Sequence, residues 1–132
     1  MRRPIALAWA GLVAVGGAGL LAAGCTAQAE ETIHVPLSDL PAHARNPAPD
    51  VWESSPWTGA SWMRYPGHVT LIVDHDLGRR PTAVLVYLAF DSSGGGSALS
   101  AGDLARIVEV TGDHVTIRND TDGEYFVRLV LH

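Results

Sequence analysis

Asp74-His75-Asp76 is the densest group of metal-ligating side chains in the chain. Successive side chains on a strand alternate between the two faces of a sheet, so Asp74 and Asp76 would share one side and His75 would take the other. That geometry does not bring all three onto one ion. We therefore favour a role for the two aspartates in shaping a turn, and keep both as candidates for a metal site.

A second group of oxygen ligands lies in residues 119–124, with the sequence Asn-Asp-Thr-Asp-Gly-Glu. Carboxylate and amide oxygens are the ligands that calcium prefers. Aligning Gly123 with the glycine of an EF-hand loop puts Arg118 at the first ligand position and Leu129 at the last, where acidic residues are needed. An ordinary turn is favoured here too, with Asp120 and Asp122 kept as metal candidates.

Signatures of the common enzyme classes are absent from the sequence. A Gly-x-Ser-x-Gly elbow fails at Ala98, and the glycines at 94–96 are not followed by the Lys and Ser/Thr of a phosphate-binding loop. The zinc motif His-Glu-x-x-His does not occur. We expect a protein that is not an enzyme and needs no cofactor, with catalysis by dispersed residues as the alternative.

Four aromatic residues, Trp52, Trp57, Trp62 and Tyr65, form the strongest candidate for a ligand-binding surface. Aromatic faces in an exposed segment stack on sugar rings or anchor a partner protein. The competing interpretation is that they fold back as a lid and supply core to a small domain that has few other means of stability. We favour the lid and keep the binding surface as the alternative.

The only cysteine, Cys25, follows an apolar run from Ile5 to Ala23 that has Arg2 and Arg3 before it. A basic start, an apolar segment and small residues before a cleavage point form an export signal. The ending Leu-Ala-Ala-Gly-Cys resembles the lipobox of bacterial lipoproteins. The resemblance implies a diacylglyceryl group on the Cys25 sulfur, cleavage just before it, and palmitate-type acyl chains in the membrane.

Two alternatives stay open for this segment. A retained membrane-spanning helix needs about 20 apolar residues, and the run is close to that length but rich in Ala and Gly. A plain secretory signal cut elsewhere would leave Cys25 removed or as a free thiol. With two acyl chains, the protein would stay anchored, extracytoplasmic, at a periplasmic or cell-surface face.

Composition limits the partners of the mature part. All 14 acidic residues lie after the signal, and seven of the nine basic residues remain there, so its formal charge is 7 − 14 = −7. An acidic protein of this kind is a poor binder of nucleic acid. Its expected partners are the membrane through Cys25, another envelope protein, a glycan, or further copies of itself.

The signal peptide is expected at residues 1–24, a lipidated tether at 25–50 and one domain at 51–132. Prolines at 36, 41, 47 and 49 argue against a helix in the tether, although residues 32–37 alternate and could form a short edge strand. In the domain we expect strands over residues 69–74, 82–90, 104–111, 115–118 and 125–131. For residues 104–111 a helix is the alternative. The loop at 91–97 is expected to be flexible and unable to pack.

Short strands joined by Gly- and Asp-containing turns predict an all-β fold, a small antiparallel sandwich or barrel of about five to six strands. His75-Asp76-Leu77-Gly78 followed by Pro81 and an apolar strand is similar to segments of small β-sandwich binding modules, such as H-type lectins and phage tail-fibre tip domains. That resemblance implies a binding module that often forms trimers. The sequence therefore predicts a lipid-anchored envelope protein with a non-enzymatic binding or structural domain. The alternatives are a lectin-like surface module and a calcium-dependent or hydrolytic envelope protein.

Overall fold

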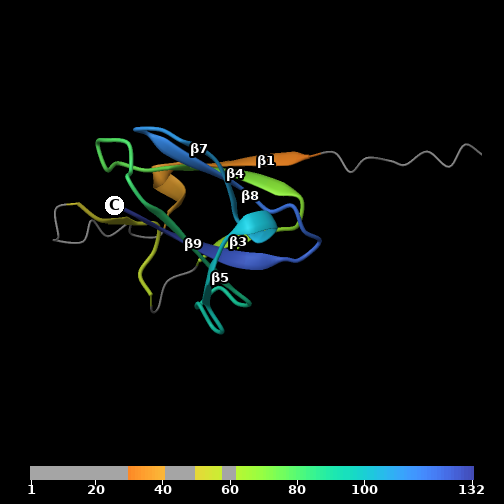
Figure 1. The fold of residues 1–132 in the computed structure, drawn as a ribbon. Helices are drawn as coiled ribbons and strands as arrows, with labels where there is room; N and C mark the ends of the chain where they lie inside the picture. The colour runs from red at the N-terminus through yellow and green to blue at the C-terminus, as the bar shows by residue number, and fades with distance from the viewer. Residues whose placement is uncertain (1–29, 41–49, 58–61) are drawn as a thin grey trace, which may run out of the picture.

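A computed structural model describes residues 30–40, 50–57 and 62–132, so Cys25 and the apolar segment before it lie outside the described residues. The described chain contains nine strands and two short 3-10 turns, η1 (Leu37–Asp39) and η2 (Gly102–Leu104). The strands form two sheets that pack face to face (Figure 1), which confirms the predicted small all-β sandwich. Within the described ranges, no helix has the length and apolar character needed to cross a bilayer.

The first sheet has four strands in the order β1-β4-β8-β7. Its members are β1 (Glu31–Val35), β4 (Val69–Asp74), β8 (His114–Arg118) and β7 (Arg106–Val110). Antiparallel pairing joins β4, β8 and β7, whereas β1 lies parallel to β4 with Glu31 opposite Val69. Alternation of buried and half-buried residues along β4 gives it one face toward the core and one toward solvent.

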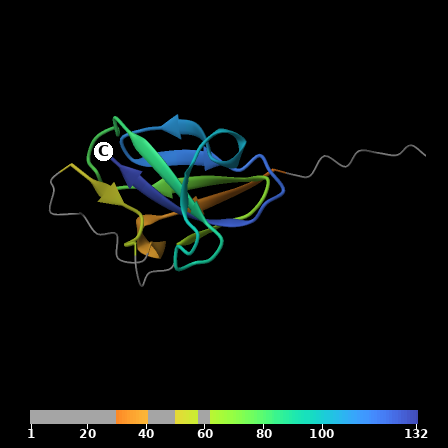
Figure 2. The same cartoon turned by 60° about the horizontal axis from the view of Figure 1, so that its bottom comes forward.

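The second sheet has five strands, and the C-terminal strand β9 (Tyr125–Leu131) pairs with three of the others. On one side β9 pairs with β5 (Val84–Ala89), which pairs in turn with β6 (Ala98–Ser100). On the other side it pairs with β2 (Trp52–Glu53) and with β3 (Met63–Tyr65). Figure 2 shows β9 in dark blue across the middle of this sheet.

The strand β1 lies within the segment expected to be a tether. Every residue from Glu31 to Val35 pairs with a residue of β4, and Ile33 and Val35 pack against the core. The sheet therefore begins before residue 51, and the edge-strand interpretation of this stretch is the one that the structure adopts. Alternation placed the apolar residues on one face, which outweighed the proline that follows at Pro36.

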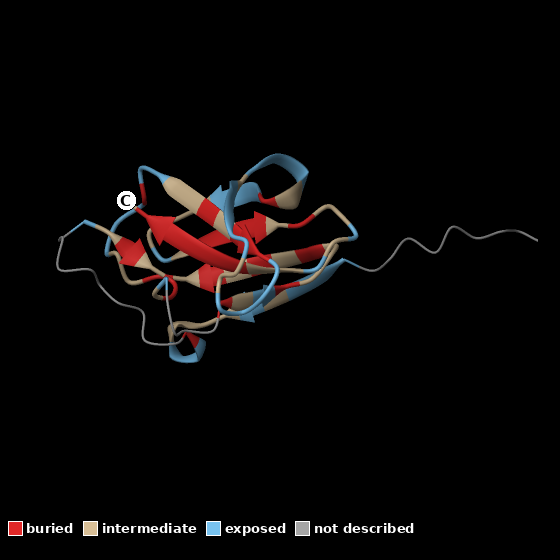
Figure 3. Cartoon of the chain, turned by 90° about the horizontal axis from the view of Figure 1, so that it is seen from below, coloured by how far each residue is buried: buried red, intermediate tan, exposed pale blue. Residues whose placement is uncertain are grey.

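The core lies between the two sheets, where red buried segments face each other in Figure 3. Its largest fully buried side chains come from both sheets and include Leu71, Ile117, Leu129 and Leu131, with Trp52 and Tyr65 closing it. All five expected strands are present, and the strand chosen over a helix at 104–111 is β7. Four short strands, β1, β2, β3 and β6, raise the number above the expected five or six because each pairs with a longer strand that has a free side.

Candidate functional site

The four candidate aromatic residues divide into three buried and one exposed. Trp52, Trp62 and Tyr65 are almost completely buried, whereas Trp57 leaves 46 % of its surface exposed. Burial, with a smaller contribution from the charge of Asp120, raises the pKa of the Tyr65 hydroxyl well above its usual range. A surface ligand can therefore reach only Trp57 among the four, and the other three do what the lid interpretation requires.

Trp57 lies over a buried arginine on the outer face of the five-stranded sheet. Arg128 is in the middle of β9, directly opposite Tyr87 of β5, and has no exposed surface. Its guanidinium carbon lies 3.9 Å from the centre of the Trp57 ring, which is cation–π geometry. The indole thus covers a cation that would otherwise face water.

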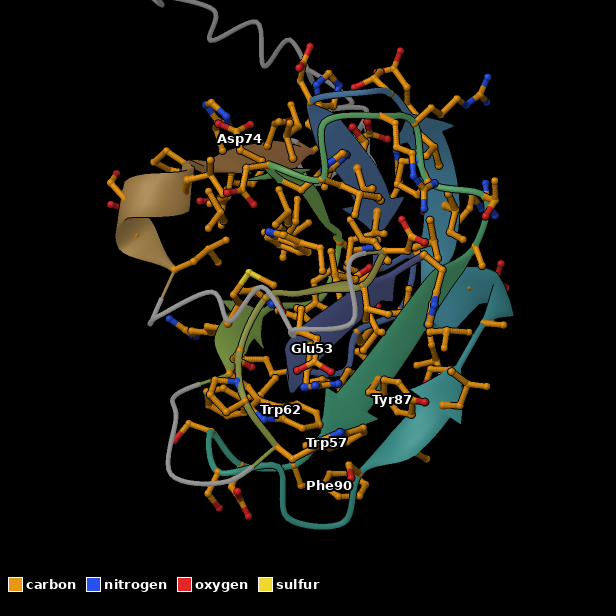
Figure 4. All side chains as sticks on the ribbon, turned by 90° about the vertical axis from the view of Figure 1, so that its left-hand side faces the viewer. Glu53, Trp57, Trp62, Asp74, Tyr87 and Phe90 are labelled. Atoms are coloured by element: carbon orange, nitrogen blue, oxygen red, sulfur yellow. The ribbon has the colours of Figure 1, made fainter. Side chains whose placement is uncertain are left out.

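Two groups from the chain just before Trp57 hold the same guanidinium. Arg128 Nε donates a hydrogen bond of 2.7 Å to the backbone oxygen of Ser55, and Arg128 Nη2 lies 2.9 Å from Glu53 Oε2. Glu53 is itself mostly buried, so the pair is poorly hydrated. Burying a charge is costly unless it is paired in this way. Figure 4 shows the Glu53 carboxylate above Trp57 and beside Tyr87.

Neighbouring rings fix the orientation of Trp57. Its ring centre lies 4.8 Å from that of Tyr87 in an edge-to-face arrangement and 5.9 Å from that of Trp62. Such ring pairs contribute about 0.5–1.5 kcal/mol beyond the area that they bury. We refer to Trp57, Trp62, Tyr87 and Arg128 as the Trp57 cluster. Figure 4 shows the rings of Trp57, Trp62 and Tyr87 close together, and of Trp57 and Trp62 only Trp57 is exposed.

The loop that follows β5 supports the cluster from behind. Trp62 donates its backbone N–H to Ser92 at 2.8 Å, and a side chain at Gly94 would come within 2.7 Å of the Trp62 ring. Asp91 Oδ1 accepts hydrogen bonds from Ser93 and from the Gly95 N–H, and these bonds hold the pKa of Asp91 below its usual value, with the Ser93 hydroxyl as the main cause. The expectation that residues 91–97 cannot pack is therefore wrong.

Asp74 and His75 lie on opposite sides of the sheet, as the alternation predicted. Asp74 Oδ1 is 2.8 Å from Nε2 of His34 on the neighbouring strand. His75 is buried, lies 6.0 Å from the Trp52 ring, and its Nε2 is 3.2 Å from the Thr111 carbonyl oxygen. Burial lowers the pKa of His75. Asp76 follows on the turn and is half-buried.

The turn at 119–124 is organised by a buried asparagine. Asn119 Oδ1 accepts from the Thr121 N–H at 3.0 Å, and Asn119 Nδ2 donates to the carbonyl oxygens of Pro66 and Gly123. Asp120 is paired with Arg118 and with Arg106, and Asp122 lies 2.7 Å from His68 Nε2. Across the described ranges, no group of three or more His, Cys, Asp or Glu residues is placed to hold a metal ion.

A shallow hollow opens at the end of the sandwich near β6. Its volume is about 200 Å³, and its walls include Leu88, Leu104, Phe90 and Tyr125. Phe90 is largely exposed at its rim, with its ring centre 6.1 Å from that of Tyr125. The walls are mostly apolar, so the hollow offers contact area and little polar recognition.

Sequence reasoning did not find the partners of Trp57. Arg128 interrupts an otherwise uncharged strand of seven residues, and such a charge signals a need for a buried counter-charge. Glu53 and Tyr87 carry no comparable signal, because they meet Arg128 only after distant segments pair. Comparisons with protein-family models, with curated proteins and with solved structures gave no significant match to this chain.

Proposed function

We propose that this protein is a lipid-anchored, extracytoplasmic binding module that contacts another envelope protein through the Trp57 cluster. The observation that carries the proposal is the position of Trp57, which is held by Arg128, Tyr87 and Trp62 and yet is 46 % exposed. Rigid Trp, Tyr and Arg side chains are the residues that most often dominate binding energy at protein interfaces. A cluster that served stability alone would have no need to leave the indole in water.

The contact surface extends along the same outer face. Leu99 of β6 lies directly opposite Tyr87 of β5 and is exposed. Paired residues of neighbouring strands point to the same face, so Leu99 and Tyr87 continue the aromatic surface away from Trp57. An apolar surface around one fixed indole suits a protein side chain or loop better than a charged ligand.

The anchor rests on Cys25 and the apolar run before it. Two acyl chains give stable attachment to a bilayer, whereas one gives only marginal binding. Metabolic labelling with a fatty acid should mark the wild-type protein and leave Cys25→Ser unlabelled in the same cells. A labelled Cys25→Ser variant, or an unlabelled wild type, would contradict the anchor.

The binding surface is tested by site-specific photo-crosslinking in native membranes. A crosslinker at Leu99 should yield a discrete adduct with another protein, and the additional change Trp57→Ala should abolish it. A crosslinker at His34 is the matched control, since this residue has similar exposure on the outer face of the other sheet. Adducts that form equally from both positions, or that survive Trp57→Ala, would refute the proposed surface.

A glycan is the second candidate ligand. It is favoured by the fixed orientation of the Trp57 ring, because a sugar ring stacks on one aromatic face and needs that face held still. A glycan array should then give a signal that is lost in Trp57→Ala and kept in Trp52→Phe, whose ring is buried. A blank array would leave the protein partner as the proposal.

A further inference from the structure

The strand β7 forms an open edge of the four-stranded sheet. It is the last strand in the order β1-β4-β8-β7, and no described strand pairs with its other side. Four of its five residues are exposed, including Ile107 at 45 % and Val108 at 55 %. An exposed edge with two adjacent β-branched residues is a ready template for another strand.

A bulge in β7 gives this edge an unusual arrangement of side chains. Arg106 lies opposite Arg118 of β8, and Glu109 lies opposite Thr116, so three steps along β7 match two steps along β8. Residues two apart on a strand share a face. The bulge therefore puts Arg106 and Glu109 on the same face of the sheet, whereas a regular strand would put them on opposite faces.

The sequence of this edge is complementary to itself. A second β7 can lie antiparallel to the first with Arg106 opposite Glu109. In this register Ile107 lies opposite Val108, and twofold symmetry makes each pair occur twice. Because of the bulge, both charged pairs lie on one face of the joined sheet. Opposite charges directly across a strand pair are favourable, and like charges are unfavourable.

We propose that the partner of β7 is a second copy of this chain, so that two four-stranded sheets join edge to edge around a twofold axis. The charges select this register, since a shift by one residue would separate both pairs. Within the chain, Arg106 Nη2 lies 3.1 Å from Asp103 Oδ1 and 3.0 Å from Asp120 Oδ2, and Glu109 Oε2 lies 3.2 Å from His114 Nε2. The Arg106, Asp103 and Glu109 side chains are largely exposed, so their contacts are weak. Asp120 is mostly buried but is also paired with Arg118, so it keeps a partner when Arg106 turns toward the second copy.

The edge of the other sheet lies on the same side of the molecule. β6 ends the five-stranded sheet and leads through η2 directly into β7 (Figure 4), and Leu99 of β6 is exposed. Pairing through β7 thus brings further apolar surface near the second copy. The paired strand is only five residues long, so the interface is small and the dimer is expected to be weak.

Charge reversal tests this arrangement in the full chain in detergent solution. Sedimentation equilibrium over a concentration series should show a monomer–dimer equilibrium for the wild type. Arg106→Glu and Glu109→Arg should each weaken the dimer about tenfold or more, because each creates two like-charge pairs. The double variant Arg106→Glu/Glu109→Arg should restore it, which no loss of folding can imitate.

The control is Arg64→Glu, which reverses an exposed charge on the other sheet that pairs with Glu124 at 3.0 Å. It should leave the equilibrium unchanged. The proposal fails if the wild type stays monomeric up to millimolar concentration. It also fails if neither single reversal weakens the dimer, or if the double variant does not restore the wild-type monomer–dimer equilibrium.

Discussion

On the outer face of the five-stranded sheet one arginine is buried under aromatic rings, whereas on the outer face of the four-stranded sheet charged groups pair in contact with water. Arg128 is covered by Trp57 and paired with the mostly buried Glu53. On the other face, the Asp74 carboxylate pairs with His34 and Arg118 pairs with Glu30, and in both pairs one partner is largely exposed. Asp120, the second partner of Arg118, is mostly buried. The inner faces of both sheets are apolar.

The difference teaches where the free energy of charge pairing is concentrated. A poorly hydrated ion pair has a small net effect on the free energy of unfolding while both partners are present. Removal of one partner leaves a buried charge unpaired and is strongly destabilising. An exposed pair contributes about 0–1 kcal/mol to the free energy of unfolding, so removal of one partner costs no more than that. We therefore expect one face to be sensitive to single substitutions and the other to be tolerant.

The largest effect is expected from Arg128→Met. It removes the only cation that pairs with Glu53 in the described structure and leaves that carboxylate mostly buried. We expect a loss of about 3–5 kcal/mol in the free energy of unfolding, measured by urea denaturation. Arg64→Met is the control, because its exposed pair with Glu124 predicts a loss of at most about 1 kcal/mol. Equal losses for both would remove the contrast between buried and exposed pairs.

A smaller effect is expected from Gly94→Ala. Gly94 has φ +86°, and a Cβ there would lie 2.7 Å from Trp62, so both backbone strain and a clash with the cluster arise. We expect a loss of about 2–3 kcal/mol, of which backbone strain supplies about 1–2 kcal/mol. Gly78→Ala isolates the strain, since Gly78 has φ +78° and open space around it. The same loss at both positions would show that the loop does not support Trp62.

The buried His75 predicts that the free energy of unfolding depends on pH. Burial lowers the pKa of His75 in the folded protein below the ordinary value of 6.5. Between pH 6.5 and this lowered pKa, the unfolded chain binds a proton that the folded chain does not bind. Stability should therefore fall as the pH decreases from about 6.5 through the lowered pKa, and be unaffected by His75 above that range. Urea titrations of His75→Gln at pH 5 and pH 8 should show a smaller difference than the wild type. An unchanged difference would assign the acid sensitivity to other groups.

The smallest effect is expected from Glu30→Gln on the hydrated face. The Glu30 carboxylate is largely exposed, its Oε1 lies 2.6 Å from Arg118 Nη2, and this contact holds the pKa of Glu30 below its usual value. Arg118 keeps its second partner, Asp120, in the variant. We expect a small loss of stability in urea denaturation that shrinks further in high salt. A large loss that does not depend on salt would contradict a hydrated pair at this position.

The sequence predicted the elements whose signal is local. Alternation over residues 69–74 and the apolar run at 125–131 gave β4 and β9, because the period of two is set by the strand itself. β2, β3 and β6 are two or three residues long and exist only because a longer strand lies beside them. No window of sequence contains that information.

The candidate site was predicted only in outline. The tryptophan-rich segment drew notice by composition, yet composition cannot say that Trp52 points inward and Trp57 outward. The side on which each falls depends on the register of β2 against β9, where Trp52 faces Leu131. Arg128 was overlooked for the same reason, since its partners Glu53 and Ser55 lie more than seventy residues earlier.

The early start of β1 limits how far the sandwich could stand from a bilayer under the proposed anchor at Cys25. Cys25 lies six residues before Glu31, where β1 begins, and six extended residues reach at most about 22 Å. Glu30 is already fastened to Arg118, which shortens that reach further. A domain anchored at Cys25 would thus rest almost on the lipid headgroups, within range of partners that are themselves embedded in or lying on the same membrane.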